Sequence, residues 1–194
     1  MATWSSRGLR GSTLEELINR SNEKYRENKL CLIQKVPTPI TPINIDKASR
    51  HITLAYFDQK STVDYIGVVQ GIPVCFDAKE CAVDTFTLAN IHPHQVEFMR
   101  AFEEQGGIAF FLLFYSHKDM FFYLRFQKLT EFWDRMQQGG RKSFRFEELE
   151  LEYQILPRQG ILVPYLDMVK KDLTERDHLT GSGDIGYNYR ELPV

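Results

Sequence analysis

Two carboxylates and one ammonium group stand at a spacing that brings them together on a β-hairpin. Two apolar runs flank a Gly-containing turn at residues 70–73, which is typical of a hairpin. Asp64 opens the first strand and Asp77 is expected to close the second, so pairing places them side by side. Side chains alternate along a strand, so Lys79 lies on the same face as Asp77. The sequence therefore predicts two acids and a lysine in one small volume.

Clustered carboxylates repel each other, and a divalent cation allows both to stay ionised. Mg²⁺ prefers oxygen ligands and typically takes one or two carboxylates together with waters and substrate phosphate oxygens. A neighbouring lysine then stabilises the charge that develops during phosphodiester hydrolysis. The bare pattern of Asp64, Asp77 and Lys79 is common in proteins. The apolar residues 74–76 before Asp77 strengthen it, because an idle charge at the end of a buried strand is costly.

The elements that position these residues alternate between helix and strand. The pattern predicts an α/β domain with a mixed sheet, preceded by a mobile basic arm over residues 1–12 and followed by a tail over 178–194. The nuclease-like domain itself is expected over residues 13–177. Helices are expected from Ser12 or Thr13 to about Asn28 and over Pro93–Gln105, Leu129–Met136 and Tyr165–Arg176, and strands over Leu30–Gln34, Ile108–Tyr115 and Met120–Phe126.

A proline-containing passage at about residues 36–54 interrupts this pattern. Pro37, Pro39 and Pro42 exclude a helix and a central strand, while the isoleucines between and after them need cover. Two structures satisfy these constraints equally well: a protruding two-stranded arm and a long surface loop.

Composition limits the classes of protein that the chain can be. The 194 residues have a net charge of −2, which argues against binding to a polyanion by bulk charge alone. The charge is uneven, however: residues 1–60 hold ten Lys/Arg against six Asp/Glu. No apolar run reaches the roughly 18 residues needed for a membrane span. The three cysteines are odd in number and are expected to be reduced and buried, which favours the cytoplasm.

Several segments, in order along the chain, resemble the RecU family of Holliday-junction resolvases, a branch of the PD-(D/E)xK nucleases. They are RGSTLEELIN, KVPTP, AYFDQKSTVDY, FDAKE, HPHQVEFM, FWDR and GGRKSFRFEEL, and they cover about Arg10 to Val169. The resemblance implies a restriction-endonuclease-like mixed sheet flanked by helices, with a protruding β stalk. It also implies a homodimer that resolves Holliday junctions with Mg²⁺, or Mn²⁺ as a substitute, by paired symmetric nicks.

The same resemblance assigns roles to individual residues. Thr62, Asp64, Asp77 and Gln95 correspond to metal ligands, Lys79 to the transition-state stabiliser, and Glu80 to a supporting acid. The family usually has Glu where this chain has Asp77, which makes the choice of metal an open question.

The resemblance also implies a DNA-binding surface. The proline-containing passage corresponds to a stalk that enters the centre of the four-way junction, where Lys35, Lys47 and Arg50 meet phosphates. Arg7 and Arg10 belong to the basic arm that orders on DNA. A recombinase and a branch-migration helicase are further partners expected from the family.

Other interpretations stay open at this point. The chain fits a PD-(D/E)xK nuclease for a flap or a restriction site, or a catalytically silent protein that only stabilises junctions. His92 and His94 are expected to serve a helix entry rather than zinc, and Phe132 and Trp133 to lie in the core. The basic residues Arg141, Lys142 and Arg145 fit a phosphate contact and a solvated loop equally well.

Overall fold

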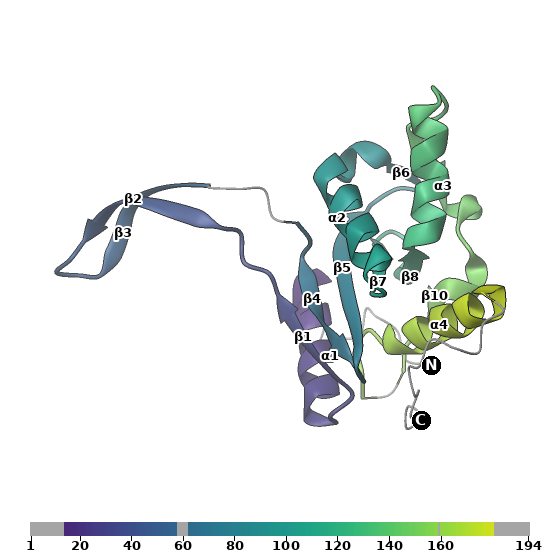
Figure 1. Cartoon of the computed structure of the whole chain (residues 1–194), viewed down its shortest axis with the longest axis horizontal. Helices are drawn as coiled ribbons and strands as arrows, with labels where there is room; N and C mark the ends of the chain where they lie inside the picture. Colours follow the sequence, from purple (N-terminus) through teal and green to yellow (C-terminus); the bar gives the residue numbers. More distant parts are fainter. Residues whose placement is uncertain (1–13, 58–61, 159, 181–194) are drawn as a thin grey trace.

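The computed structural model describes residues 14–57, 62–158 and 160–180, with side chains up to residue 176. A six-stranded sheet in the order β1-β4-β5-β7-β8-β10 forms the centre of the molecule (Figure 1). Strands β5 and β7 run parallel, and the other neighbours are antiparallel, so the predicted mixed sheet is confirmed. The strands are β1 Cys31–Lys35, β4 Tyr65–Val69, β5 Ile72–Cys81, β7 Ile108–Tyr115, β8 Met120–Arg125 and β10 Gln154–Ile155.

Four helices cover the two faces of this sheet. Helices α1 (Leu14–Glu27) and α4 (Leu166–Thr180) pack on one face, and α2 (Pro93–Glu104) and α3 (Phe126–Gln137) pack on the other. The predicted helices all form. Helix α4 continues to Thr180, past the domain end expected at residue 177.

Strand alternation divides the hydrophobic core into two parts. Val74 and Phe76 of β5 belong to the core under α1 and α4, while Cys75 between them belongs to the core under α2 and α3. Strand β7 contributes to both cores in the same way, as expected of a strand buried on both faces. Phe132 and Trp133 of α3 lie in the second core, so their predicted core role is confirmed. All three cysteines are free and buried, also as predicted.

The proline-containing passage forms an arm rather than a loop. Strands β2 (Ile40–Asp46) and β3 (His51–Phe57) pair antiparallel in a sheet of their own that projects from the domain (Figure 1). The arm is longer than the predicted residues 36–54, since β3 runs on to Phe57. The ladder shifts register next to Pro42, whose ring nitrogen has no hydrogen to donate.

A second small sheet was not predicted. Strands β6 (Thr85–Thr87) and β9 (Ser143–Arg145) pair antiparallel, and β9 lies in a segment expected to be a basic loop. The reason is Phe144, which is fully buried and stacks on Phe86 and Phe132 at centroid distances of 5.1 Å and 4.5 Å. Three short 3₁₀ helices complete the fold: Leu88–Asn90, Phe146–Glu148 and Leu151–Tyr153.

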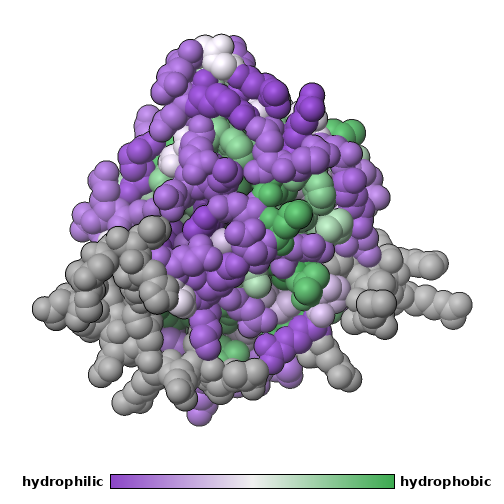
Figure 2. All heavy atoms as spheres, turned by 90° about the vertical axis from the view of Figure 1, so that its right-hand side faces the viewer, coloured by the Kyte–Doolittle hydropathy of each residue, from purple (hydrophilic) through white to green (hydrophobic). Residues whose placement is uncertain are grey.

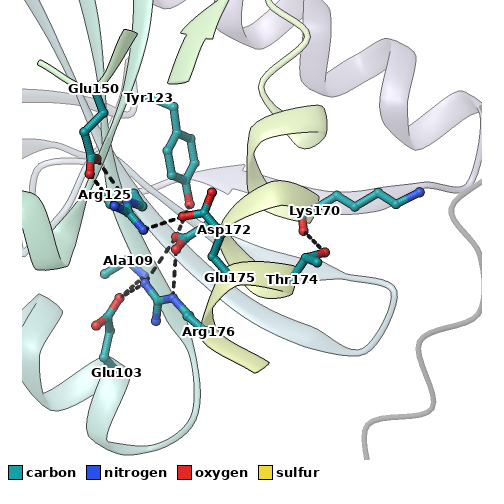
Figure 3. Close-up of polar contacts among 10 residues, drawn as sticks. All are labelled: Glu103, Ala109, Tyr123, Arg125, Glu150, Lys170, Asp172, Thr174, Glu175 and Arg176. Carbon is teal, nitrogen blue, oxygen red and sulfur yellow. Dashed lines mark hydrogen bonds and ion pairs between the residues drawn. The ribbon is translucent and has the colours of Figure 1, made fainter. Parts of the chain in front are cut away.

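A buried polar network holds α4 against the rest of the domain (Figure 3). Asp172 is 1% exposed and accepts hydrogen bonds from the Tyr123 hydroxyl at 2.9 Å and from Arg176 Nε at 3.0 Å. Arg176 also contacts Glu103, at the end of α2, at 2.7 Å. The backbone amide of Ala109 donates to the same Glu103 carboxylate, so the network joins α4, α2, β7 and β8.

A neighbouring ion-pair cluster extends this network. Arg125, at the end of β8, donates to the Glu150 carboxylate through two of its nitrogens and to Glu175 of α4 at 2.8 Å (Figure 3). No helix in the described part of the chain is both long and apolar enough to cross a membrane.

Candidate functional site

The hairpin of β4 and β5 brings the two predicted carboxylates together. Tyr65 pairs with Phe76, so Asp64 and Asp77 come next to each other one position further along the ladder. The Asp64 backbone amide donates to Asp77 Oδ1 at 2.7 Å, and the Ala78 amide donates to Asp64 Oδ2 at 3.0 Å. The predicted convergence of the two acids is confirmed.

The place of Asp77 within its strand was predicted wrongly. Asp77 lies in the middle of β5, which continues to Cys81, instead of closing the strand. The second half of β5 is held by the parallel strand β7, where Asp77 pairs with Phe111 and Cys81 with Tyr115. Asp77 is therefore part of a central strand and is 0% exposed.

Asp77 is held by donors on three sides. Besides the Asp64 amide, its Oδ2 atom accepts from Lys79 Nζ at 2.8 Å and from Gln95 Nε2. Lys79 lies on the same face of β5, as strand alternation predicts, and its side chain remains 21% exposed. Hydrogen-bond donors thus surround the buried acid, while the lysine reaches the surface.

Asp64 is the carboxylate under electrostatic strain. Burial raises the pKa of Asp64 above its usual range, and the negative charge of Asp77 adds to the effect. The usual way to offset such a cost is a cation between the two acids. Among the residues that the structure describes, no group of three or more His, Cys, Asp and Glu side chains gathers, so this site offers a pair of carboxylates only. The two carboxylates offer the oxygen ligands that Mg²⁺ prefers, and Mg²⁺ keeps water and phosphate oxygens among its other ligands.

Gln95 reaches this site from the first turn of α2. Its Oε1 atom accepts from the His92 backbone amide at 3.0 Å, and the side chain is 6% exposed. His92 is the residue that caps the helix and Pro93 occupies its first turn, so the predicted helix-entry role of this segment is confirmed. The amide nitrogen of Gln95 faces Asp77, and the oxygen faces the helix cap.

The other expected site residues lie further out. Thr62 and Glu80 are exposed. Glu80 is one position from Lys79 along β5, so strand alternation directs it to the opposite face from the two aspartates. The structure therefore does not gather Glu80 with the carboxylate pair.

The arm joins the domain directly at this site. Val36, which follows β1, donates its amide to the Asp64 carbonyl at 2.8 Å, so the chain leaves for the arm and returns from it beside Asp64. Lys35 stands at this base and forms an ion pair with Glu15 of α1. Lys47 and Arg50 lie in the turn at the far end of the arm and are exposed.

Arg7 and Arg10 lie outside the described residues. The sequence leaves open whether the basic residues in 141–145 contact phosphate or only solvent. It does not predict that Ser143–Arg145 pairs with Thr85–Thr87. The signal that points to it is the alternation of polar and aromatic residues in Thr85–Thr87 and again in Ser143–Arg145.

Comparison with known proteins identifies the family of the chain. The family described as Recombination protein U matches residues 9–171. A Pediococcus pentosaceus protein named Holliday junction resolvase RecU is 41% identical over 173 residues, which cover 84% of each chain. Proteins of the same name from Levilactobacillus brevis and Bacillus subtilis are 40% identical over 178 residues (89% of each chain) and 41% identical over 145 residues (73% of this chain and 69% of the relative). On this match and these identities, the chain belongs to the RecU family.

Proposed function

We propose that the protein is a Mg²⁺-dependent endonuclease that resolves Holliday junctions by paired symmetric nicks during recombination and DNA repair. The relatives that carry the name Holliday junction resolvase support the substrate. The observation that carries the chemistry is the contact of Asp64, Asp77 and Lys79 on one hairpin, directly at the base of the arm.

Asp64 and Asp77 hold the cation in this proposal, and Thr62 and Gln95 add oxygen ligands. A bound Mg²⁺ lowers the pKa of a water ligand and neutralises charge on the scissile phosphate. Gln95 has to turn its amide to present its oxygen, because that oxygen caps α2 in the structure. Lys79 stabilises the charge on the phosphate oxygens, and Glu80 is left out of this metal site because it faces the other side of β5.

The metal preference of the site has to be measured because this chain has Asp77 at a ligand position. Both of its oxygens already accept protein hydrogen bonds, and the side chain is one methylene shorter than the glutamate usual in the family. We expect Mn²⁺ to substitute for Mg²⁺.

A homodimer is the assembly that paired cuts require, since one site cuts one strand. Ten of the thirteen exposed large hydrophobic residues in the described part of the chain lie on the arm and on β1 and β4. The face on the far side of the domain, over α3 and α4, is mainly hydrophilic (Figure 2). A second copy of the chain is the occupant we assign to these ten apolar side chains, whereas the cations at the base and the tip of the arm are left to DNA. The ten residues are Leu32, Ile40, Ile43, Ile45, Ile52, Leu54, Tyr56, Phe57, Ile66 and Val68.

The dimer is tested by Ile66→Glu, measured by sedimentation equilibrium. The charge should shift the protein towards monomers and leave the melting temperature of the domain near that of the wild type. An unchanged dimer, or a wild-type monomer at micromolar concentration, would contradict this surface.

The cations of the arm and the N-terminal segment are proposed to contact DNA. Lys47 and Arg50 at the arm tip meet phosphates near the branch point, Lys35 does so at the arm base, and Arg7 and Arg10 extend the contact. The proposal places the reaction in the cytoplasm, where a recombinase and a branch-migration helicase of the same pathway are partners.

The deciding experiment compares three DNA substrates. A synthetic mobile four-way junction, a linear duplex and a Y-fork are incubated with protein and Mg²⁺ or Mn²⁺. Paired symmetric nicks in the junction alone, abolished by Lys79→Ala while junction binding persists, are the expected result. Equal cutting of the linear duplex would reject junction resolution, and binding without cleavage in either metal would indicate a junction-stabilising protein instead.

A further inference from the structure

The small β6–β9 sheet includes part of the connection between β5 and α2, which carry site residues, and it has a polar outer face. We infer that this surface, called here the polar ribbon and made of Thr85–Thr87 and Lys142–Arg145, binds the phosphate backbone of a duplex DNA arm. The inference rests on the proposed function, since it assigns a further part of the same DNA to this surface. It adds a contact on the side of the carboxylate pair that faces away from the arm.

Alternation along the two strands separates the aromatic from the polar side chains of the ribbon. Phe86 and Phe144 pair across it and are fully buried. Thr85 pairs with Arg145, and Thr87 with Ser143, so these four side chains share the opposite, outer face. Thr85, Thr87 and Arg145 are exposed. A face of hydroxyls and a guanidinium offers hydrogen-bond donors, the chemistry that phosphate oxygens require.

The cations at the ribbon differ in whether an acid already neutralises them. Glu148 binds Arg135 at 2.6 Å and Arg141 at 3.1 Å, so these two arginines are committed to the protein. Lys142 and Arg145 are exposed and form no ion pair with any residue that the structure describes. The sequence left this basic segment undecided between a solvated loop and a phosphate contact, and the pairing separates its free cations from its bound ones.

The acid nearest the start of the ribbon is also neutralised from elsewhere. Asp84 contacts Lys118 at 3.0 Å and His117 at 2.7 Å, both in the turn between β7 and β8. These contacts hold the pKa of Asp84 below its usual range. Its charge is therefore balanced before DNA approaches, and it adds little repulsion to a phosphate at Arg145.

The position of the ribbon links it to the site. Strand β6 lies between Lys79 on β5 and Gln95 on α2 in the sequence, so the ribbon belongs to the connection that joins two site residues. The Leu88 amide donates to the Lys142 carbonyl at 3.0 Å, which fixes Lys142 against that connection. The arm leaves from β1 and β4, whereas β6 and α3 lie on the other side of β5 (Figure 1). A duplex that passes the carboxylate pair can therefore touch the arm base on one side and the ribbon on the other.

The test uses the double variant Lys142→Gln/Arg145→Gln. Its matched control is Arg20→Gln/Lys170→Gln, which removes two exposed cations from α1 and α4, on the opposite face of the sheet. Binding to a four-way junction and to a linear duplex is measured by fluorescence anisotropy in Ca²⁺ over a range of KCl concentrations. Each lost phosphate contact should lower the slope of log affinity against log salt by about 0.9. The salt slope of the ribbon variant should therefore fall by about 1.8 on both DNAs, and the salt slope of the control should not change.

A second variant separates hydrogen bonding from charge. Thr87→Val/Ser143→Ala removes two hydroxyls from the outer face but releases no counterions. Affinity for both DNAs should fall about two- to tenfold for each neutral hydrogen bond that is lost, with an unchanged salt slope. Melting temperatures close to the wild type are expected for both variants, since these side chains form no ion pair with any residue that the structure describes.

The outcomes also distinguish the ribbon from the proposed function. An unchanged salt slope and affinity in both ribbon variants would overturn the inference, even for an active resolvase. Equal losses in the ribbon variant and the control would do the same, because they would report only net charge. A wild-type protein that fails to cut junctions but shows the expected ribbon losses would reject the proposed function and retain the DNA contact.

Discussion

Removal of Arg176 is the sharpest test of how α4 is held. The substitution Arg176→Met keeps a long side chain of similar reach and deletes the guanidinium that contacts both Asp172 and Glu103 (Figure 3). Asp172, at 1% exposure, then keeps the Tyr123 hydroxyl, and Glu103 keeps the Ala109 amide. One buried carboxylate, Asp172, and one partly buried carboxylate, Glu103, are left without their cation.

The expected cost follows from that burial. Breaking a buried ion pair by removing one partner typically costs about 3–5 kcal/mol. For a chain of this length each kcal/mol lowers the melting temperature by about 2–4 °C, so a drop of about 6–20 °C is expected. Lys170→Met is the matched control, because Lys170 is an exposed cation on the same helix, and it should change stability by less than about 0.5 kcal/mol.

The loss of unfolding free energy in Arg176→Met should grow as the pH rises. Burial raises the pKa of Glu103 above its usual range, and Arg176 opposes that rise. A carboxyl with a raised folded pKa contributes stability that is complete below its unfolded pKa and is lost as pH rises through its folded pKa. Without Arg176 the folded pKa rises further, so the deficit should be small near pH 4 and reach its full size by about pH 8.

Urea unfolding followed by far-UV circular dichroism at several pH values measures the free energy of unfolding directly. A loss below about 1 kcal/mol at pH 8, or a loss of the same size at pH 4 and pH 8, would show that the network does not hold α4 as described.

Three further predictions concern the hairpin and the ribbon. Asp64→Asn removes the carboxylate whose pKa is raised by burial and by Asp77, so the metal-free variant should melt above the wild type at pH 8 and lose its stabilisation by Mg²⁺ in a thermal-shift titration. Equal stabilisation of both proteins by Mg²⁺ would contradict a cation at Asp64. Gly67→Ala places a Cβ 2.1 Å from the Leu32 carbonyl oxygen, so it should lower the free energy of unfolding in urea by about 1–3 kcal/mol. An unchanged free energy of unfolding would mean that β1 shifts away from β4 at little cost. Phe144→Ala should cost about 3–5 kcal/mol and expose the amides of β9 to hydrogen exchange, whereas retained protection would show that stacking does not hold the ribbon.

The hairpin and its two acids were predictable because their contacts are local. Only two residues form the turn between β4 and β5, Gln70 and Gly71, both with positive φ, and Gly71 adopts its φ of 92° without strain. With the turn fixed, antiparallel pairing leaves little choice about which residue faces Asp64. The buried stripe of α1 and the apolar strand β7 were equally readable, since each pattern follows from one element alone.

Other features needed contacts between distant segments. The sequence placed Asp77 at a strand end, but the parallel partner β7, some thirty residues later, extends β5 past it to Cys81. The choice between an arm and a loop was open because each strand of the arm is half-apolar with no core to cover it. The predicted approach of Gln95 to the acids holds, yet only the helix cap at His92 decides that its nitrogen, not its oxygen, faces Asp77.

The sequence by itself determined the chemistry of the site: two acids and a lysine on one hairpin, at the base of a proline-containing excursion. The tertiary structure decided which charges remain available. Glu148 takes up Arg135 and Arg141, so Lys142 is left exposed in the same basic segment. The energy of an ion pair falls as the distance between its charges grows. Arg135 of α3 and Glu148 come within reach of each other only because the packed core brings their elements together.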